Sequence, residues 1–462
     1  MIKVKFKNLG NIKNGEVEIK NFTILAGQNN MGKTYVSYAL YSLFDKDFNY
    51  NLKEIKPIVK ELYKKGFYNL NLKKFFDTNY QNMKKEVETA FSKNLFSIFS
   101  AKQDEFSKSE MTFTLDEEKI KKSLINTVHK STFAIGKDKN IILEGIKEKN
   151  SIDLSLVLLS SSFPEDIIEE QLKILLSRFL FNSLFSNSFL LPAERTGLNL
   201  FYQELSSERT AMFHHFGKDE INKGELIRDL IISSYPQPIA DYIDFLNKTF
   251  RNKKLNSEFR DLAVKIHTKI LNGKYSVEKD GIYFFPYKNG ANKDNYNKKI
   301  SLHLSSSTVK TFFSLVFYLE HLAKIGDTLI IDEPELNLHP DNQRKIARIL
   351  AMISNRGIKV IVSTHSDYFI RELNNLIMLK EDFISKQEIM QKYGYSESML
   401  ISDKNINAYL FQNNGISKME VDSKEGIIAK TFDNVINILN LSTDEIFFQK
   451  EADLEEENAE SN

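Results

Sequence analysis

The sequence predicts an α/β fold in which a mixed or parallel sheet carries flanking helices and a large, mainly helical insertion. Three observations lead to this prediction. Strand patterns and one apolar helix fill residues 1–45, lysine- and glutamate-rich helical segments follow, and strands and helices alternate closely from 301 to about 380. Strands that alternate with helices in this way are typical of a layered α/β domain.

The predicted boundaries follow these changes along the chain. The α/β head takes residues 1–45, 185–200 and 270–400, and helical insertions take residues 46–184 and 201–269. A β-hairpin is expected at 275–286, around the turn at Asp280 and Gly281. Residues 401–450 are predicted to form a C-terminal extension. The acidic residues 451–462 are predicted to be disordered because they offer little apolar surface to bury.

The composition excludes several classes of protein. Of the 462 residues, 42% are apolar and 27% are charged, which is ordinary for a soluble protein, and 63 basic residues nearly balance 62 acidic ones. The absence of cysteine excludes a disulfide framework, a zinc ribbon and a cysteine nucleophile. No stretch approaches the roughly 18 apolar residues of a membrane span, and the first residues lack a signal-peptide pattern. We therefore expect a cytoplasmic protein without a membrane partner.

A phosphate-loop motif lies between the apolar strand 22–26 and the helical pattern 35–44. It is formed by Gly27, Gln28, Asn29, Asn30, Met31, Gly32, Lys33 and Thr34, and it matches G-x-x-x-x-G-K-[ST]. Its glycines let backbone N–H groups surround a phosphate, and the following helix adds its positive N-terminus. Lys33 is expected to reach the β- and γ-phosphates of ATP, and Thr34 to bind Mg²⁺.

An apolar strand at 328–331 ends in a pair of carboxylates, Asp332 and Glu333. Asp332 is expected to hold Mg²⁺ between the β- and γ-phosphates, and Glu333 to polarise the attacking water. Pro334 interrupts the strand and would let the chain curve so that both side chains serve one site. The alternative for this motif alone is an acidic helix cap.

A second apolar strand, at 358–362, follows the helix predicted at 340–353 and ends in Ser363, Thr364 and His365. The two strands and their helix form a βαβ-like unit, which collects ligands at one edge of a parallel sheet. At that edge His365 could sense the γ-phosphate. The alternative is a purely structural hydrogen bond.

These motifs together resemble the ABC-type ATPases of the SMC and RecF class, and most of all the prokaryotic AAA-family defence ATPases and OLD-type ATPases. The stretches that carry the resemblance are GQNNMGKT, FLLPAERTGL, LIIDEPELNLHP and VSTHSDYFIRELNNLI. The resemblance implies an ABC-type P-loop ATPase head. It also implies ATP and Mg²⁺ as cofactors and a homodimer or higher oligomer in which two heads sandwich two ATP molecules.

The serine triplet Ser305, Ser306 and Ser307 stands where this class carries its signature motif, before an apolar helix. The resemblance implies that it contacts the γ-phosphate bound by a partner subunit. The family has glycines at two of these positions, and serine restricts the backbone there. The alternative is a plain helix cap. A second triplet, at 160–162, lacks this downstream context.

Other polar residues leave open alternatives. Glu194 and Arg195 follow another apolar strand, and they either contact nucleotide or Mg²⁺ or form an internal ion pair. His214 and His215 have no third ligand at a metal-binding spacing, which favours a surface pair.

The resemblance implies an ATP-dependent dimeric switch that controls a separately encoded effector, for example a nuclease, in antiphage defence. No constellation typical of the Toprim nuclease of OLD-type proteins is visible after His365. The alternative is a DNA-repair ATPase of the RecF or SMC type, so nucleic acid stays among the candidate partners. A transporter subunit is disfavoured by the long insertion and by the missing LSGGQ-like motif.

Overall fold

The computed structural model describes residues 2–44, 53–126, 128–135, 140–181, 187–216, 235–287, 299–428 and 438–452. The boundaries predicted near residues 45 and 184 lie outside these ranges. So do the middle of the second insertion, at 217–234, and most of the predicted acidic tail, at 453–462.

A nine-stranded mixed sheet forms the centre of the head, in the order β5-β1-β2-β16-β15-β3-β14-β13-β9. Its strands are β1 Ile2–Leu9, β2 Ile12–Ile19, β3 Phe22–Gly27, β5 Glu110–Leu115, β9 Ser188–Leu191, β13 Thr328–Asp332, β14 Lys359–Thr364, β15 Ile406–Gln412 and β16 Gly415–Met419. The strands from β15 to β9 run parallel to one another, and the opposite end is largely antiparallel. The fold is therefore the mixed α/β architecture that the sequence predicts.

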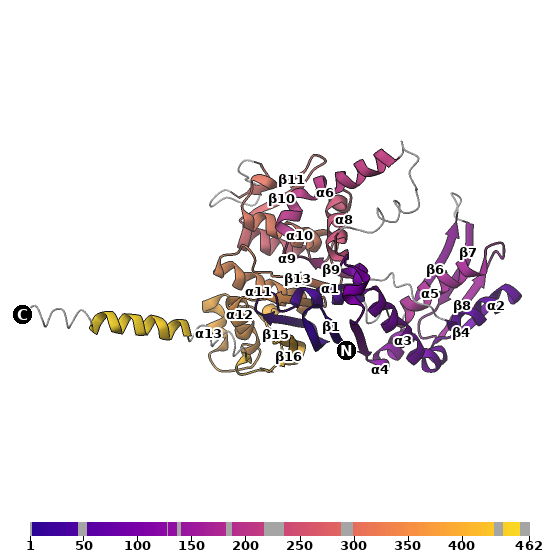
Figure 1. The fold of residues 1–462 in the computed structure, drawn as a ribbon, viewed down its shortest axis with the longest axis horizontal. Helices are drawn as coiled ribbons and strands as arrows, with labels where there is room; N and C mark the ends of the chain where they lie inside the picture. Colours follow the sequence, from indigo (N-terminus) through magenta and orange to yellow (C-terminus); the bar gives the residue numbers. More distant parts are fainter. Residues whose placement is uncertain are drawn as a thin grey trace, which may run out of the picture.

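The parallel strands β3 and β13 are buried on both faces. Every residue of β3 and of β13 is buried, as expected for apolar runs that helices cover on both sides. The helices of the head are α1 Lys33–Phe44, α6 Arg195–Phe216, α8 Gln237–Asn252, α9 Arg260–Ile266, α10 Ser307–His321, α11 Pro340–Asn355, α12 Asp367–Met378 and α13 Lys386–Tyr393. The helix at 438–452 extends away from the rest of the protein (Figure 1).

The predicted βαβ unit is confirmed by the pairing of β13 and β14, which are parallel neighbours joined through α11. The predicted hairpin is confirmed as well. It consists of β10 Gly273–Val277 and β11 Ile282–Pro286, which pair antiparallel, and the short β12 Ile300–Ser301 extends it. The helices α8, α9 and α10 lie close to this hairpin (Figure 1).

The segment between residues 53 and 181 contains a sheet in addition to the helices that we expected. It holds the helices α2 Lys56–Lys65, α3 Leu72–Ile98, α4 Glu117–Asn126 and α5 Glu165–Phe181, and also the strands β4 Phe67–Asn71, β6 His129–Ile135, β7 Asn140–Lys147 and β8 Asp153–Leu158. These strands form a separate sheet, β4-β8-β7-β6, in an arm at one side of the molecule (Figure 1). The sequence analysis missed them because short strands with lysines between apolar residues look like amphipathic helix over a few residues.

Two segments predicted to lie outside the head contribute to its sheet. β5 pairs with β1 along six residues, and β15 lies directly beside β3. The predicted C-terminal extension at 401–450 is therefore continuous with the head up to β16, and the small β17 Val421–Asp422 and β18 Gly426–Ile427 follow. Pairing between residues almost 400 positions apart leaves no local signal in the sequence.

No helix within the described ranges is long and apolar enough to cross a membrane.

Candidate functional site

The carboxyl ends of four neighbouring parallel strands bring the predicted motifs together. β3 leads into the phosphate loop, β13 ends at Asp332, β14 ends at Thr364, and β9 leads to Arg195. The register places Asp332 opposite Ser363, and Thr364 opposite Ala26. Ligands of parallel α/β sheets bind outside these strand ends, so this edge is the candidate site.

The phosphate loop curls back over the start of α1. Gly27 and Gly32 have φ values of 146° and 90°, which are unfavourable for any side chain. A Cβ atom on Gly27 would stand 2.6 Å from the carbonyl oxygen of Phe411 in β15, and one on Gly32 would stand 2.9 Å from Ile12. Both glycines are therefore required by the close packing of the loop as well as by its turn.

Lys33 lies inside this loop and is 6% exposed. Its ammonium donates hydrogen bonds to the carbonyl oxygens of Gly27, at 2.8 Å, and Gln28, at 2.7 Å. Burial lowers the pKa of Lys33. A buried cation whose bonds go to neutral carbonyls is ready to bind an anion, so the loop fits the phosphates of a nucleotide.

Asp332 and Thr34 meet beside the loop. The Thr34 hydroxyl donates to Asp332 Oδ2 at 3.0 Å, and the Ser363 hydroxyl donates to Oδ1. Asp332 is 2% exposed, and burial raises the pKa of its carboxyl to about 7, with further contributions from Glu333 and Glu194. A cation would offset this unfavourable burial of charge, so the Thr34–Asp332 pair fits a divalent metal held together with phosphates.

No group of three or more His, Asp or Glu side chains is arranged to hold a metal ion by itself in the described part of the chain. A cation at Thr34 and Asp332 would therefore depend on oxygen ligands from the nucleotide and from water.

Glu333 and His365 lie side by side, just beyond the ends of β13 and β14. His365 Nδ1 is 3.5 Å from Glu333 Oε1, and both side chains are accessible to solvent. The backbone of Glu333 has φ 51°, a left-handed conformation that is uncommon for a residue with a side chain. Its N–H donates to the carbonyl oxygen of Ser363 at 3.0 Å. The turn after β13 therefore places the Glu333 carboxylate beside His365.

Glu335 belongs to the same cluster, although the sequence analysis assigned it no role. It is 5% exposed, and its Oε1 accepts hydrogen bonds from the Thr364 hydroxyl, at 2.7 Å, and the His365 N–H, at 2.9 Å. Its Oε2 has no hydrogen-bond partner among the described residues. The close spacing of the acidic residues Asp332, Glu333 and Glu335 was the sequence signal that could have identified Glu335 as part of the site. Buried carboxylates are rare unless they are paired.

Arg195 fits neither alternative that the sequence analysis considered. Its buried guanidinium donates to three main-chain carbonyl oxygens, those of Pro192 at 2.9 Å, Asp332 at 2.6 Å and Glu333 at 2.6 Å. Burial lowers its pKa. By bonding to the carbonyl oxygens of Asp332 and Glu333, Arg195 fixes the main chain of the turn at Glu333. Sequence reasoning could not find this role because it depends on the neighbouring positions of β9 and β13.

Helix α6 continues from Arg195 and connects this turn to helix α10. Thr196 forms a hydroxyl–hydroxyl bond of 2.9 Å with Thr311, and Asn199 Nδ2 donates to the carbonyl oxygen of Lys310 at 2.7 Å. Asn337, in the loop after Glu335, donates to Thr196 at 3.4 Å and accepts from the Thr308 hydroxyl at 3.2 Å. The start of α10 is therefore tied to the loop that carries the carboxylates.

The serine triplet lies at the N-terminus of α10. Ser306 is the N-cap, and its hydroxyl accepts from the Val309 N–H at 3.4 Å, while the Ser305 hydroxyl donates to the carbonyl oxygen of Ser301 at 3.1 Å. Ser306 and Ser307 are exposed, and Leu304 just before them is 73% exposed. The triplet thus caps a helix and at the same time presents its start to solvent.

The other candidates lie apart from this cluster. In the second triplet, Ser160 and Ser162 bond to each other at 2.7 Å in an exposed turn before α5. His214 and His215 lie in α6, and their side chains are outside the described part of the chain.

The AAA ATPase domain family matches residues 1–370 of this chain. The curated relatives include the cell division ATP-binding protein FtsE of Bacillus subtilis, which is 33% identical over 69 residues, covering 15% of this chain and 30% of that protein. They also include the Old nuclease of Escherichia phage P2, which is 30% identical over 122 residues, covering 25% of this chain and 20% of that protein. The chain spans less than a third of the length of either relative.

Solved structures of SMC head domains are also similar to the chain. The Pyrococcus furiosus head, with an extended coiled coil and bound to the C-terminal domain of ScpA, is 12% identical, with 96% of this chain and 100% of that chain covered and a TM-score of 0.33. The Thermotoga maritima head is 11% identical, with 91% and 98% covered and a TM-score of 0.31.

Proposed function

Because the chain belongs to the AAA ATPase domain family, it is an ATPase, and we propose that it works as an ATP-dependent dimeric switch. In this proposal two copies sandwich two ATP molecules, hydrolysis resets the dimer, and a separately encoded effector responds to the dimeric state. The observation that carries the proposal is a difference between two helix starts. The loop before α1 holds the buried Lys33 and lies beside the carboxylate of Asp332, whereas the start of α10 presents Ser306 and Ser307 to solvent.

Each residue of the cluster has a role in this proposal. The loop from Gly27 to Thr34 binds the phosphates, with Lys33 as the charged contact. Thr34 and Asp332 would hold Mg²⁺, which would supply positive charge next to the phosphates. Glu333 accepts a proton from the attacking water, and His365 contacts the γ-phosphate beside it.

The residues behind the cluster keep these groups in position. Arg195 fixes the turn that presents Glu333, and Glu335 fixes the backbone of His365. Ser305, Ser306 and Ser307 of the second copy complete the site, because a helix N-terminus with free N–H groups favours a bound anion.

Mixing two inactive variants tests the sandwich. Lys33→Ala removes the phosphate contact, and Ser305→Arg fills the start of α10 with a bulky side chain. Each variant alone should lose at least about 90% of ATP turnover. In a mixed dimer, the intact phosphate loop of the Ser305→Arg copy faces the intact triplet of the Lys33→Ala copy. Equal mixing should therefore restore about a quarter of wild-type turnover, because half of the dimers carry one intact site of two.

Ser162→Arg is the matched control, because it places the same side chain in the other, exposed serine triplet. It should leave turnover unchanged. Full activity of Ser305→Arg would contradict an ATP site shared between two copies. So would a mixture that recovers no turnover while ATP still dimerises the protein. Turnover that instead needs DNA, with a steep dependence on salt concentration, would favour a DNA-repair ATPase over the effector switch.

A further inference from the structure

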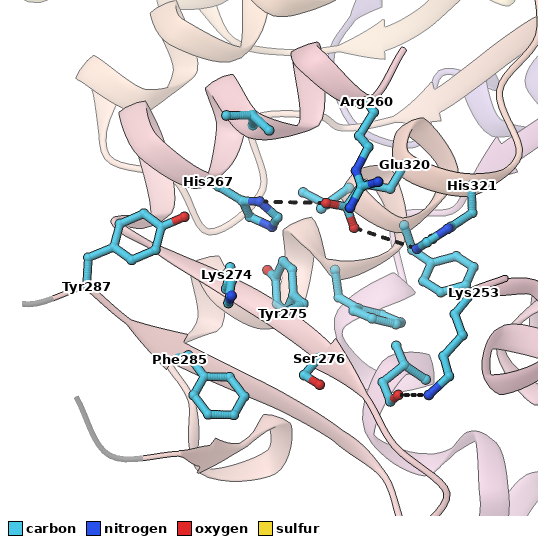
Figure 2. A pocket seen from close by; sticks show the side chains of 15 residues that line it. Lys253, Arg260, His267, Lys274, Tyr275, Ser276, Phe285, Tyr287, Glu320 and His321 are labelled. Atoms are coloured by element: carbon cyan, nitrogen blue, oxygen red, sulfur yellow. Dashed lines mark hydrogen bonds and ion pairs between the residues drawn. The ribbon is translucent and has the colours of Figure 1, made fainter. Parts of the chain in front are cut away.

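A second cavity lies behind helix α10, away from the phosphate loop. Its volume is about 650 Å³, and its walls come from the end of α8, from α9, from the β10–β11 hairpin and from the second half of α10 (Figure 2). This volume is in the range of pockets that hold small molecules. None of its lining residues belongs to the ATP site described above.

The charged lining of this cavity is mostly positive. Among the described residues, Lys253, Arg260 and Lys274 line it, together with one carboxylate, that of Glu320. Lys253 donates to the carbonyl oxygen of Val277 at 2.7 Å, which keeps its cation at the wall of the cavity. Burial raises the pKa of Glu320 to about 7, so this carboxyl carries only part of a negative charge at neutral pH. The field inside the cavity therefore favours an anion.

His267 provides an independent sign that a ligand belongs here. The side chain is 5% exposed, and its Nδ1 is 3.8 Å from Glu320 Oε1 (Figure 2). Its Nε2 is buried and has no hydrogen-bond partner among the described residues. Burial lowers the pKa of His267 to about 4, so the ring is neutral and Nε2 remains able to form a hydrogen bond. Buried polar atoms in proteins are nearly always satisfied, so a bound group is expected at this atom.

The hairpin side of the cavity is aromatic. Tyr275, Phe285 and Tyr287 line it from β10 and β11 (Figure 2). Aromatic faces next to cations suit a ligand that combines a planar ring with an anionic group.

We propose that this cavity binds a small phosphorylated metabolite with an aromatic base, of the class of nucleoside monophosphates. The phosphate lies toward Arg260 and Lys274, the base lies against the rings of the hairpin, and His267 Nε2 bonds to the ligand. The site is distinct from the ATP site and does not depend on the proposed switch. Its ligand would touch α10, the helix that begins at the serine triplet.

Equilibrium dialysis with radiolabelled AMP tests this site directly. The wild-type chain should bind AMP with a Kd below about 1 mM, and Lys33→Ala should bind it equally well, because the phosphate loop is not involved. Arg260→Glu reverses a charge at the exposed rim of the cavity and should weaken binding at least about tenfold. Arg251→Glu is the matched control, since Arg251 is exposed near the end of α8 and does not line the cavity.

A second variant tests whether binding is lost because the cavity is altered and not because the charge of the protein has changed. Ser276→Trp fills the cavity without changing its charge and should also abolish binding, while thermal unfolding shows that both variants are folded. An excess of inorganic phosphate should displace AMP only partly, because it lacks the base. The site is overturned if the wild-type chain does not bind 1 mM AMP, if Lys33→Ala loses binding, or if Arg260→Glu and Arg251→Glu bind alike.

Discussion

The starts of helices α1 and α10 both offer N–H groups to an anion but differ in structure. The loop GQNNMG precedes α1, and Ser305 and Ser306 precede α10. Before α1, two glycines with positive φ shape the loop around a buried lysine, and the carboxylate of Asp332 stands beside it. Before α10, Ser306 and Ser307 are exposed, and Ser306 caps its own helix.

The comparison indicates that a helix start fits a phosphate when its neighbours supply charged groups, as Lys33 and Asp332 do at α1. The start of α1 has these neighbours within one chain. The start of α10 is linked, through α6 and Asn337, to the loop that carries Glu333 and Glu335. We expect a second copy of the chain to supply the charged groups that would complete a site there.

The largest effect is expected for Glu333→Gln, which tests the α1 side. The amide keeps the shape of the side chain but cannot accept a proton from water, so turnover should fall about a thousandfold while ATP binding persists. An ATP-dependent dimer should accumulate in size-exclusion chromatography with light scattering. The double variant Lys33→Ala, Glu333→Gln should stay monomeric. If Glu333→Gln bound ATP but stayed monomeric, this would contradict the proposal that the start of α10 contacts the ATP of a second copy.

Arg195→Met tests the connection between the two helix starts. It removes the donors to three buried carbonyl oxygens, which should cost about 3 kcal/mol of unfolding free energy and lower turnover more than tenfold. Urea denaturation and phosphate release measure the two effects. Arg371→Met, which removes an exposed arginine from α12, should change either quantity little. Equal stability of the two variants would show that Arg195 does not hold the turn.

Asp332→Asn tests the buried charge beside α1 in the nucleotide-free protein. The folded-state pKa of Asp332 is about 7, above its ordinary value of 3.8, so between these values the folded chain binds more protons than the unfolded chain. Its contribution to unfolding free energy therefore falls as pH rises from about 4 to about 7.

The asparagine variant lacks this loss, and it should be more stable than the wild type by about 2 kcal/mol at pH 8 and nearly equal at pH 4. This is about half of what the pKa shift alone corresponds to, since the hydroxyls of Thr34 and Ser363 bind an amide less strongly. Denaturant titrations across this pH range measure the difference. A difference that does not depend on pH would contradict the buried charge.

The smallest effect is expected for Ser306→Ala, on the α10 side. Loss of the cap should lower the unfolding free energy by about 1 kcal/mol, because the bond to the Val309 N–H is long. Ser306→Asp should retain the cap, which thermal unfolding would show. If Ser306→Ala lost turnover but no stability, its hydroxyl would serve the phosphate rather than the helix.

The sequence by itself determined the motifs and much of their arrangement. The phosphate loop, the strand that ends at Asp332 and the strand that ends before His365 were recognisable because each is a local pattern. Their convergence followed from the parallel pairing of strands joined by a helix, which brings carboxyl ends to one edge. Local patterns also predicted the hairpin, at 275–286, which the structure places at 273–286.

Only the tertiary structure decided which other residues hold these motifs in position. Arg195 could be assigned to the carbonyl oxygens of Asp332 and Glu333 only once β9 was seen beside β13. Likewise β15, whose Phe411 packs against Gly27, comes almost 400 residues after the loop that it supports. The physical reason is the same in both cases. Hydrogen bonds between distant strands and to main-chain carbonyls depend on the folded position of a residue, and that position leaves no periodic pattern in the sequence.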